Sequence, residues 1–160
     1  MGYFCASAIS RATPCWAMVP IVVDRDSPSA QSLMQSLVGF RRKWPGGGFS
    51  WDGRFDCVAS SFSATLESEA RAALALLFKF QWTARSLRTA PEEVQDVATQ
   101  VGGLRQDQVL VASEPNDTLM AYGLWWPWGD DVTISLRVGI AGHSAQRYFE
   151  QFRDIFGVTL

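Results

Sequence analysis

The sequence predicts a single α+β domain over residues 1–160, in which a mainly antiparallel sheet with a Trp-rich C-terminal hairpin packs against about four helices. Three observations support this fold class. Residues 118–142 contain two strand-like runs joined by a turn, Asp52-Gly53 separates two shorter runs, and apolar residues recur at helical spacing in four other segments. With 48% hydrophobic and 19% charged residues, the chain has the composition of an ordered globular protein.

The N-terminal part of the chain shows little pattern before its first helix. Residues 1–14 have no periodicity, so we expect them to be poorly ordered. Residues 16–23 are apolar and β-branched, which is typical of a short strand at a sheet edge or of an extended loop. Pro28 suits the first turn of a helix that carries three cations, residues 41–43, in its last turn. Residues 45–48, Pro-Gly-Gly-Gly, end that helix.

The middle of the chain predicts one hairpin and two helices. Asp52-Gly53 indicates a two-residue turn, because both central positions of such a turn favour positive φ. Residues 64–87 are apolar nearly all round in their centre, so we expect one long helix that packs across the sheet. Thr89 and Glu92 have capping-box spacing and open the next helix, which Gly102-Gly103 terminates.

The C-terminal part predicts a strand, the larger hairpin and a last helix. Residues 109–112 are typical of a strand, and the last helix begins after the cap Ser144 and ends at Gly157. In the hairpin, pairing Trp126 with Val132 makes one face wholly apolar. The same register gives the pairs Leu124 with Ile134, Tyr122 with Leu136 and Met120 with Val138.

Charge and cysteine usage narrow the classes of partner and compartment. A net charge of -2 argues against nucleic acid and anionic lipid as partners, and no apolar stretch is long enough to span a membrane. Cys5, Cys15 and Cys57 form an odd set without metal-binding spacing, which favours reduced thiols in a cytoplasmic protein. The sequence contains no motif for a metal or a cofactor, and we predict neither.

Two groups of residues give weaker hypotheses for a functional site, a pocket near His143 and an anion-binding site. His143, the only histidine, could lie with Arg137 and Ser144 at the mouth of a pocket in an enzyme or a small-molecule-binding protein, although no catalytic set surrounds it. An anion could bind a basic cluster, although a solvated helix end explains the same residues. This cluster comprises Arg41, Arg42, Lys43 and Arg54.

The turn of the larger hairpin provides the leading hypothesis. Trp125 and Trp128 have no evident place in the core of the predicted register, and Asp130 and Asp131 lie in the turn beside them. Tryptophan is enriched among binding hot spots and carboxylates steer basic partners, so these four residues are our predicted site for another protein. The competing interpretations are that helices cover the rings, or that the aromatic surface forms a homo-oligomer.

The general make-up of the chain agrees with the leading hypothesis. A small, mildly acidic, Trp-rich α+β protein without a catalytic set resembles bacterial immunity or antitoxin-type proteins, which neutralise a toxin or effector. This resemblance concerns composition and covers no specific positions.

Overall fold

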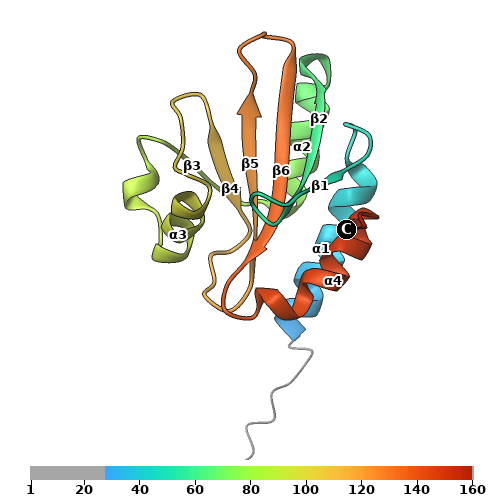
Figure 1. Ribbon diagram of the computed structural model, residues 1–160, viewed down its shortest axis with the longest axis vertical. Helices are drawn as coiled ribbons and strands as arrows, with labels where there is room; N and C mark the ends of the chain where they lie inside the picture. Colours follow the sequence, from blue (N-terminus) through green and yellow to red (C-terminus); the bar gives the residue numbers. More distant parts are fainter. Residues whose placement is uncertain (1–27, 160) are drawn as a thin grey trace, which may run out of the picture.

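The computed structural model describes residues 28–159, and within them one six-stranded antiparallel sheet is flanked by four helices (Figure 1). The predicted α+β fold class is therefore confirmed. The strand order is β1-β2-β6-β5-β4-β3. The expectations for residues 1–14 and 16–23, and those for Cys5 and Cys15, lie outside the described residues.

The elements follow one another along the chain in an order that mixes helices with strands. They are α1 (Pro28–Lys43), β1 (Ser50–Asp52), β2 (Cys57–Ser63), α2 (Glu67–Leu77), β3 (Phe80–Thr83), α3 (Glu92–Gln100), β4 (Val109–Ala112), β5 (Met120–Pro127), β6 (Thr133–Ala141) and α4 (Ala145–Phe156). Two short 3₁₀ turns occupy Ala64–Leu66 and Leu87–Thr89. No helix between residues 28 and 159 is long and apolar enough to cross a membrane.

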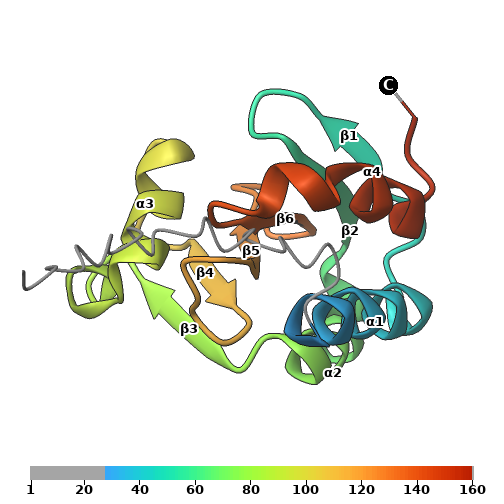
Figure 2. The ribbon, with the colours of Figure 1, turned by 90° about the horizontal axis from the view of Figure 1, so that it is seen from below.

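Helices cover both faces of the sheet. Helices α1, α2 and α4 share one apolar core with the strands, whereas α3 forms a second, smaller core on the opposite face. Figure 2 shows α3 across the sheet from α1 and α2. Burial on both faces explains why β5 is apolar at almost every position instead of alternating with polar residues.

The larger core is built around an aromatic cluster on α1. Phe40 is fully buried, and its ring lies 5.5 Å from Trp44 and 5.7 Å from Phe78, measured between centroids. The indole Nε1 of Trp44 donates a hydrogen bond of 3.1 Å to Ser60 Oγ on β2, so the ring is buried with its polar atom satisfied. The helix predicted to begin at Pro28 is confirmed, with Arg41, Arg42 and Lys43 in its last turn as expected.

The long helix predicted over residues 64–87 is wrong in its second half. Helix α2 ends at Leu77, and Phe78 is already extended, with φ -95° and ψ 104°. Residues 80–83 then form the edge strand β3, which pairs with β4. Aromatic residues and threonine favour strands, and an apolar run of this length does not distinguish a helix from a helix followed by a strand.

Several remaining elements agree with the sequence, but β2 extends to Ser63 and the Ser144 side chain makes no capping hydrogen bond at α4. Helix α3, strand β4 and helix α4 lie where the patterns place them, and Gly157 ends α4 with φ 66°. Thr89 does not cap α3, because its hydroxyl donates to the carbonyl of Ser86 at 2.7 Å. Asp52 pairs with Cys57, so four residues connect β1 to β2 where a two-residue turn was predicted.

The register of the β5–β6 hairpin differs from the predicted one by three positions. Trp126 pairs with Ser135 instead of Val132, and Trp125 pairs with Leu136. An odd displacement exchanges the two faces of a strand. Trp125 therefore points into the larger core, and Trp126 points to the face that carries α3. Because β5 is apolar on both faces, its sequence pattern could not select between these registers.

Candidate functional site

The turn between β5 and β6, which we call the apex (residues 128–132), is held in a fixed shape by Asp130. The carboxylate accepts hydrogen bonds from the amides of Val132 and Thr133 at 3.1 and 2.9 Å, and from the Thr133 hydroxyl at 2.7 Å. The Thr133 hydroxyl and these amides lower the pKa of Asp130 below its ordinary value. Asp130 thus organises the loop internally, although it was predicted as a partner contact.

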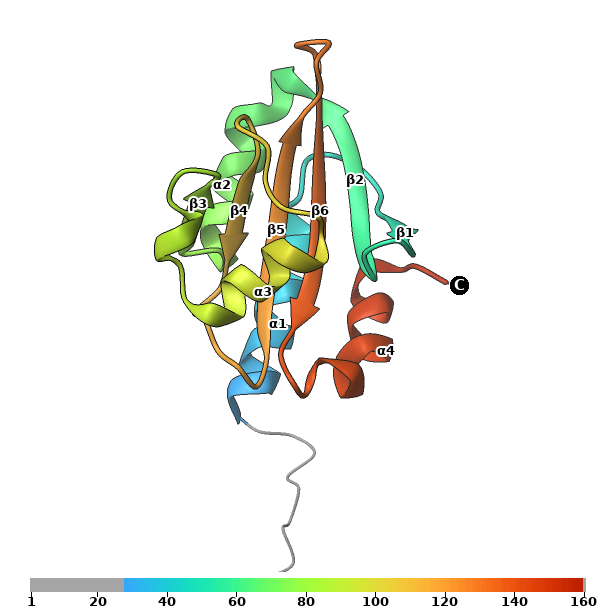
Figure 3. The same ribbon diagram turned by 60° about the vertical axis from the view of Figure 1, so that its left-hand side comes forward.

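The apex presents apolar side chains to solvent. Trp128 is 53% exposed and Val132 is 60% exposed, which is unusual for large apolar residues in this fold. Figure 3 shows the apex extending beyond the other strand ends. The backbone amide of Trp128 donates to the carbonyl of Thr133 at 2.8 Å, which closes the loop beneath the exposed ring.

Trp125 does not belong to the exposed surface. Its ring is 2% exposed, packs edge to face against Phe62 with centroids 5.5 Å apart, and is covered by the guanidinium of Arg71 at 4.6 Å. The prediction of Trp125 as an exposed partner contact is therefore wrong, because the observed register turns this residue inward.

A notch lies between the apex and the start of α2, with a volume of about 200 Å³. We call it the apex notch and define it by Glu67, Arg71, Asp107, Trp125, Trp128 and Asp131. Arg71 forms an ion pair with Glu67 at 2.9 Å, whereas Asp107 and Asp131 have no ion-pair partner among residues 28–159. Pockets for small organic ligands usually measure about 300–1,000 Å³, so this notch suits a single side chain better.

The residues of the predicted ligand pocket are not brought together. His143 and Ser144 lie in the loop after β6. Their backbone amides donate to the carbonyls of Asp117 and Thr118, at 2.9 Å each. Arg137 lies in the middle of β6, six residues earlier and therefore about 20 Å away along the strand. Its side chain belongs to a different site.

The predicted basic cluster is also divided. Arg41 lies over the ring of Phe49, with Cζ 5.6 Å from the centroid, at the end of α1. Arg54 instead turns towards Asp52 in the β1–β2 loop, with Nη2 3.1 Å from Oδ2. Trp44, which follows the α1 cations, is buried and cannot serve as a stacking platform.

A charged group that the sequence did not reveal lies on the face that carries α3. Asp52 Oδ2 also accepts from Arg137 Nε at 3.0 Å, so two guanidinium groups share one carboxylate. The hydrogen bonds from Arg54, and those from Arg137, lower the pKa of Asp52 to about 2 against the opposing effect of burial. The guanidinium of Arg137 stacks on Trp126, with Cζ 4.2 Å from the centroid. No sequence signal links Asp52 to Arg137, because 85 residues separate them.

This charged group borders a hollow of about 390 Å³, which we call the arginine cleft. The residues that define it here are Arg54, Phe55, Leu104, Arg105, Trp126 and Arg137. Its walls come from the β1–β2 loop, the two central strands and the loop after α3.

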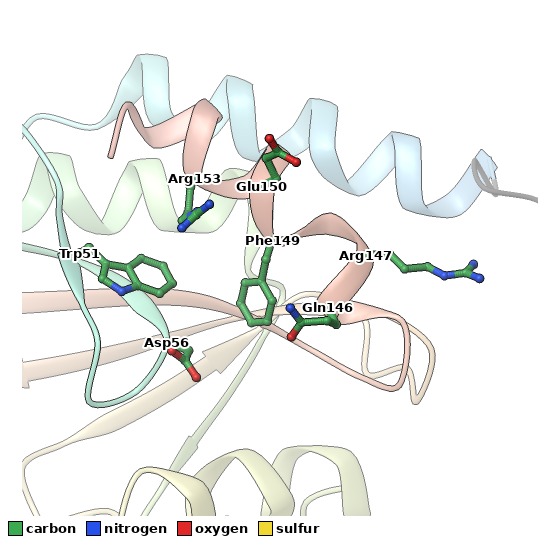
Figure 4. A pocket seen from close by; sticks show the side chains of 7 residues that line it. All are labelled: Trp51, Asp56, Gln146, Arg147, Phe149, Glu150 and Arg153. Carbon is green, nitrogen blue, oxygen red and sulfur yellow. The ribbon is translucent and has the colours of Figure 1, made fainter. Parts of the chain in front are cut away.

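A third hollow of about 490 Å³ separates α4 from the β1–β2 hairpin. Figure 4 shows Trp51, Asp56, Gln146 and Phe149 around this space, with Arg153 directed towards Trp51. The guanidinium of Arg153 lies 5.9 Å from the Trp51 centroid, and its Nε has no hydrogen-bond partner within residues 28–159. Two acidic and two basic residues line the hollow, so its charge favours no class of ligand.

The described residues offer no assembled metal site. No three His, Cys, Asp or Glu side chains between positions 28 and 159 converge as metal ligands do. Burial raises the pKa of the Cys57 thiol to about 12, which keeps it protonated and poor as a ligand or nucleophile.

Comparison with known proteins adds no family to these observations. No protein-family model matches the chain, and no curated protein or solved structure matches it either. Function is therefore argued from the geometry of the sites alone.

Proposed function

We propose that this protein is a protein-binding module that engages a basic segment of a partner protein through the apex notch. The observation that carries the proposal is the exposed ring of Trp128, on a loop whose backbone Asp130 holds in shape, beside two carboxylates without ion-pair partners among the described residues. A loop with a preorganised backbone loses less conformational entropy on binding, and tryptophan is enriched at hot spots.

The chemistry of the apex notch favours a cationic side chain as the central contact. A lysine or arginine of the partner can lie against the Trp128 ring while its charge approaches Asp131 and Asp107. Arg71 is already held by Glu67 and stacked on Trp125, so it does not neutralise these two carboxylates. Their remaining negative charge would accelerate association with a basic partner.

We place this binding in the cytoplasm, in an immunity or antitoxin-type role in which the protein neutralises a basic toxin or effector. The unpaired thiol of Cys57 supports a reducing compartment. The composition of the chain and the acidic apex notch support a basic target. Neutralising proteins are encoded beside their targets, so the product of the neighbouring reading frame is the first partner to purify.

The test is the affinity of that purified partner for the wild type and for two apex variants, measured by isothermal titration calorimetry. Trp128→Ala should weaken binding at least tenfold, and Asp131→Asn should weaken binding more at low salt than at high salt, because salt screens the lost charge. Leu76→Ala is the matched control for the first change, because Leu76 is equally exposed, at 56%, but lies on α2. Equal affinities of the wild type and Trp128→Ala would end the proposal.

Self-association is the second candidate, because Trp128 and Val132 form an exposed apolar pair. Size-exclusion chromatography with light scattering separates the two possibilities. A dimer that dissociates in Trp128→Ala would assign the apex to a homo-oligomeric interface, whereas a monomer leaves it free for another protein.

A further inference from the structure

The arginine cleft lies on the opposite face of the sheet from the apex notch, and its charge is unbalanced. Arg54, Arg105 and Arg137 all line it, while Asp52 is the one carboxylate that forms ion pairs with them. The side chain of Arg105 has no hydrogen bond or ion pair with any described residue. Three cations and one anion leave an excess of about two positive charges.

The aromatic residues of the cleft orient its guanidinium groups. Arg137 stacks on Trp126, and Arg54 lies over Phe55 with Cζ 5.3 Å from the centroid. The two rings themselves meet edge to face at 6.0 Å. Arg54 donates from Nε and Nη2 to Asp52, whereas Arg137 donates from Nε to Asp52 and from Nη1 to Ser135. Arg137 Nη2 and the whole guanidinium of Arg105 therefore remain to contact the oxygens of a phosphate or carboxylate.

The cleft also has room and apolar surface for an organic group. Its volume of about 390 Å³ lies within the range of small-molecule sites, and Leu104 and Val101 contribute an apolar wall. Trp126 Nε1 is buried there without an acceptor among residues 28–159. Arg105 is carried on a loop that Gln108 fixes, because the Gln108 side chain accepts from the Arg105 amide at 2.8 Å.

We propose that the arginine cleft binds a small organic phosphate monoester, with Arg105 and Arg137 contacting the phosphate and Leu104 contacting the organic group. A phosphate monoester carries a charge of about −1.5 to −2 at pH 7, which matches the excess charge of the cleft. This site is independent of the apex notch and does not require a protein partner.

Calorimetric titration of the full chain with defined probes tests the proposal. The probes are adenosine 5′-monophosphate, glucose 6-phosphate, glycerol 3-phosphate, adenosine and inorganic phosphate. At least one monoester should bind tenfold or more tightly than inorganic phosphate, and adenosine should not bind. If none of the three monoesters exceeds inorganic phosphate, the assignment is overturned.

Variants locate the binding and distinguish it from nonspecific charge effects. Arg105→Gln should weaken the best monoester at least tenfold without changing the melting temperature, because the Arg105 side chain supports no other contact. Arg85→Gln removes another exposed cation, which lies outside the cleft, and should leave the affinity unchanged. Equal losses in both variants, or no loss in Arg105→Gln, would overturn the site. Arg137→Lys, which keeps the charge but removes the guanidinium and its free Nη2, should weaken binding as well.

Discussion

Asp52 should be the carboxylate whose removal costs the described fold most. Its side chain is 11% exposed and holds Arg137, which is 14% exposed, and Arg54, which is 72% exposed. These partners lower its pKa from 3.8 to about 2. A difference of one pKa unit between the folded and the unfolded chain corresponds to about 1.4 kcal/mol, so the lowered pKa of Asp52 contributes about 2 kcal/mol to the free energy of unfolding at neutral pH. We therefore expect Asp52→Asn to lower the free energy of unfolding at pH 7 by about 2 kcal/mol.

The same argument fixes the pH dependence of this loss. Asp52 ionises at lower pH in the folded chain than in the unfolded chain, so its stabilisation is fully present above about pH 4. It disappears as the pH falls through 4 to about 2, where the carboxylate becomes protonated in both states. The difference in stability between wild type and Asp52→Asn should therefore shrink steadily over that range.

Urea denaturation followed by far-ultraviolet circular dichroism at pH 7, 5 and 3 measures the difference. Asp96→Asn is the matched control, because Asp96 is exposed on α3 and has no ion-pair partner among the described residues. A loss below about 0.5 kcal/mol for Asp52→Asn at pH 7 would refute the reasoning, since surface pairs contribute about that much. A loss that is equal at pH 7 and pH 3 would refute the assignment to ionisation.

Two glycines give further predictions from backbone and packing. In Gly139→Ala, the new Cβ atom would lie 2.4 Å from the ring of the buried Tyr122. We therefore expect the free energy of unfolding to fall by about 1–3 kcal/mol, with a lower melting temperature by calorimetry. An unchanged melting temperature would contradict this packing. In Gly157→Ala, the alanine must adopt the left-handed φ of 66°, so the free energy of unfolding measured by urea denaturation should fall by about 1–2 kcal/mol. A more stable variant would show that α4 does not end in this conformation.

Local patterns predicted the elements but not their pairing. Helices α1 and α3 have clear periodicity, strand β4 is a short apolar run, and a terminating glycine correctly placed the end of α4. The register of β5 was not accessible in the same way, because both its faces are buried and alternation carries no information there. The division of residues 64–87 into a helix and an edge strand depends on pairing with β4, which is a tertiary contact.

Only those residues of the candidate sites that lie in a single loop could be predicted from the sequence. Trp128 and Asp131 belong to the apex and were predicted from the composition of the turn. Glu67 and Asp107 come from other parts of the chain, and only the fold brings them to the same notch. The pair of Asp52 and Arg137 has the same origin, because it forms between a hairpin loop and a strand 85 residues further along.

The register of the β5–β6 hairpin determines which tryptophan lies at the apex notch and which lies in the arginine cleft. In the observed pairing, Trp125 lies under Arg71 and forms the floor of the apex notch, while Trp126 carries Arg137 in the arginine cleft. A displacement by one position would exchange the two rings and remove both stacked arginines. Neighbouring tryptophans thus face opposite sides of the sheet, Trp125 towards the apex notch and Trp126 towards the arginine cleft. The loop after α3 also contributes to both sites, with Asp107 at the apex notch and Arg105 in the arginine cleft, so it connects them as β5 does.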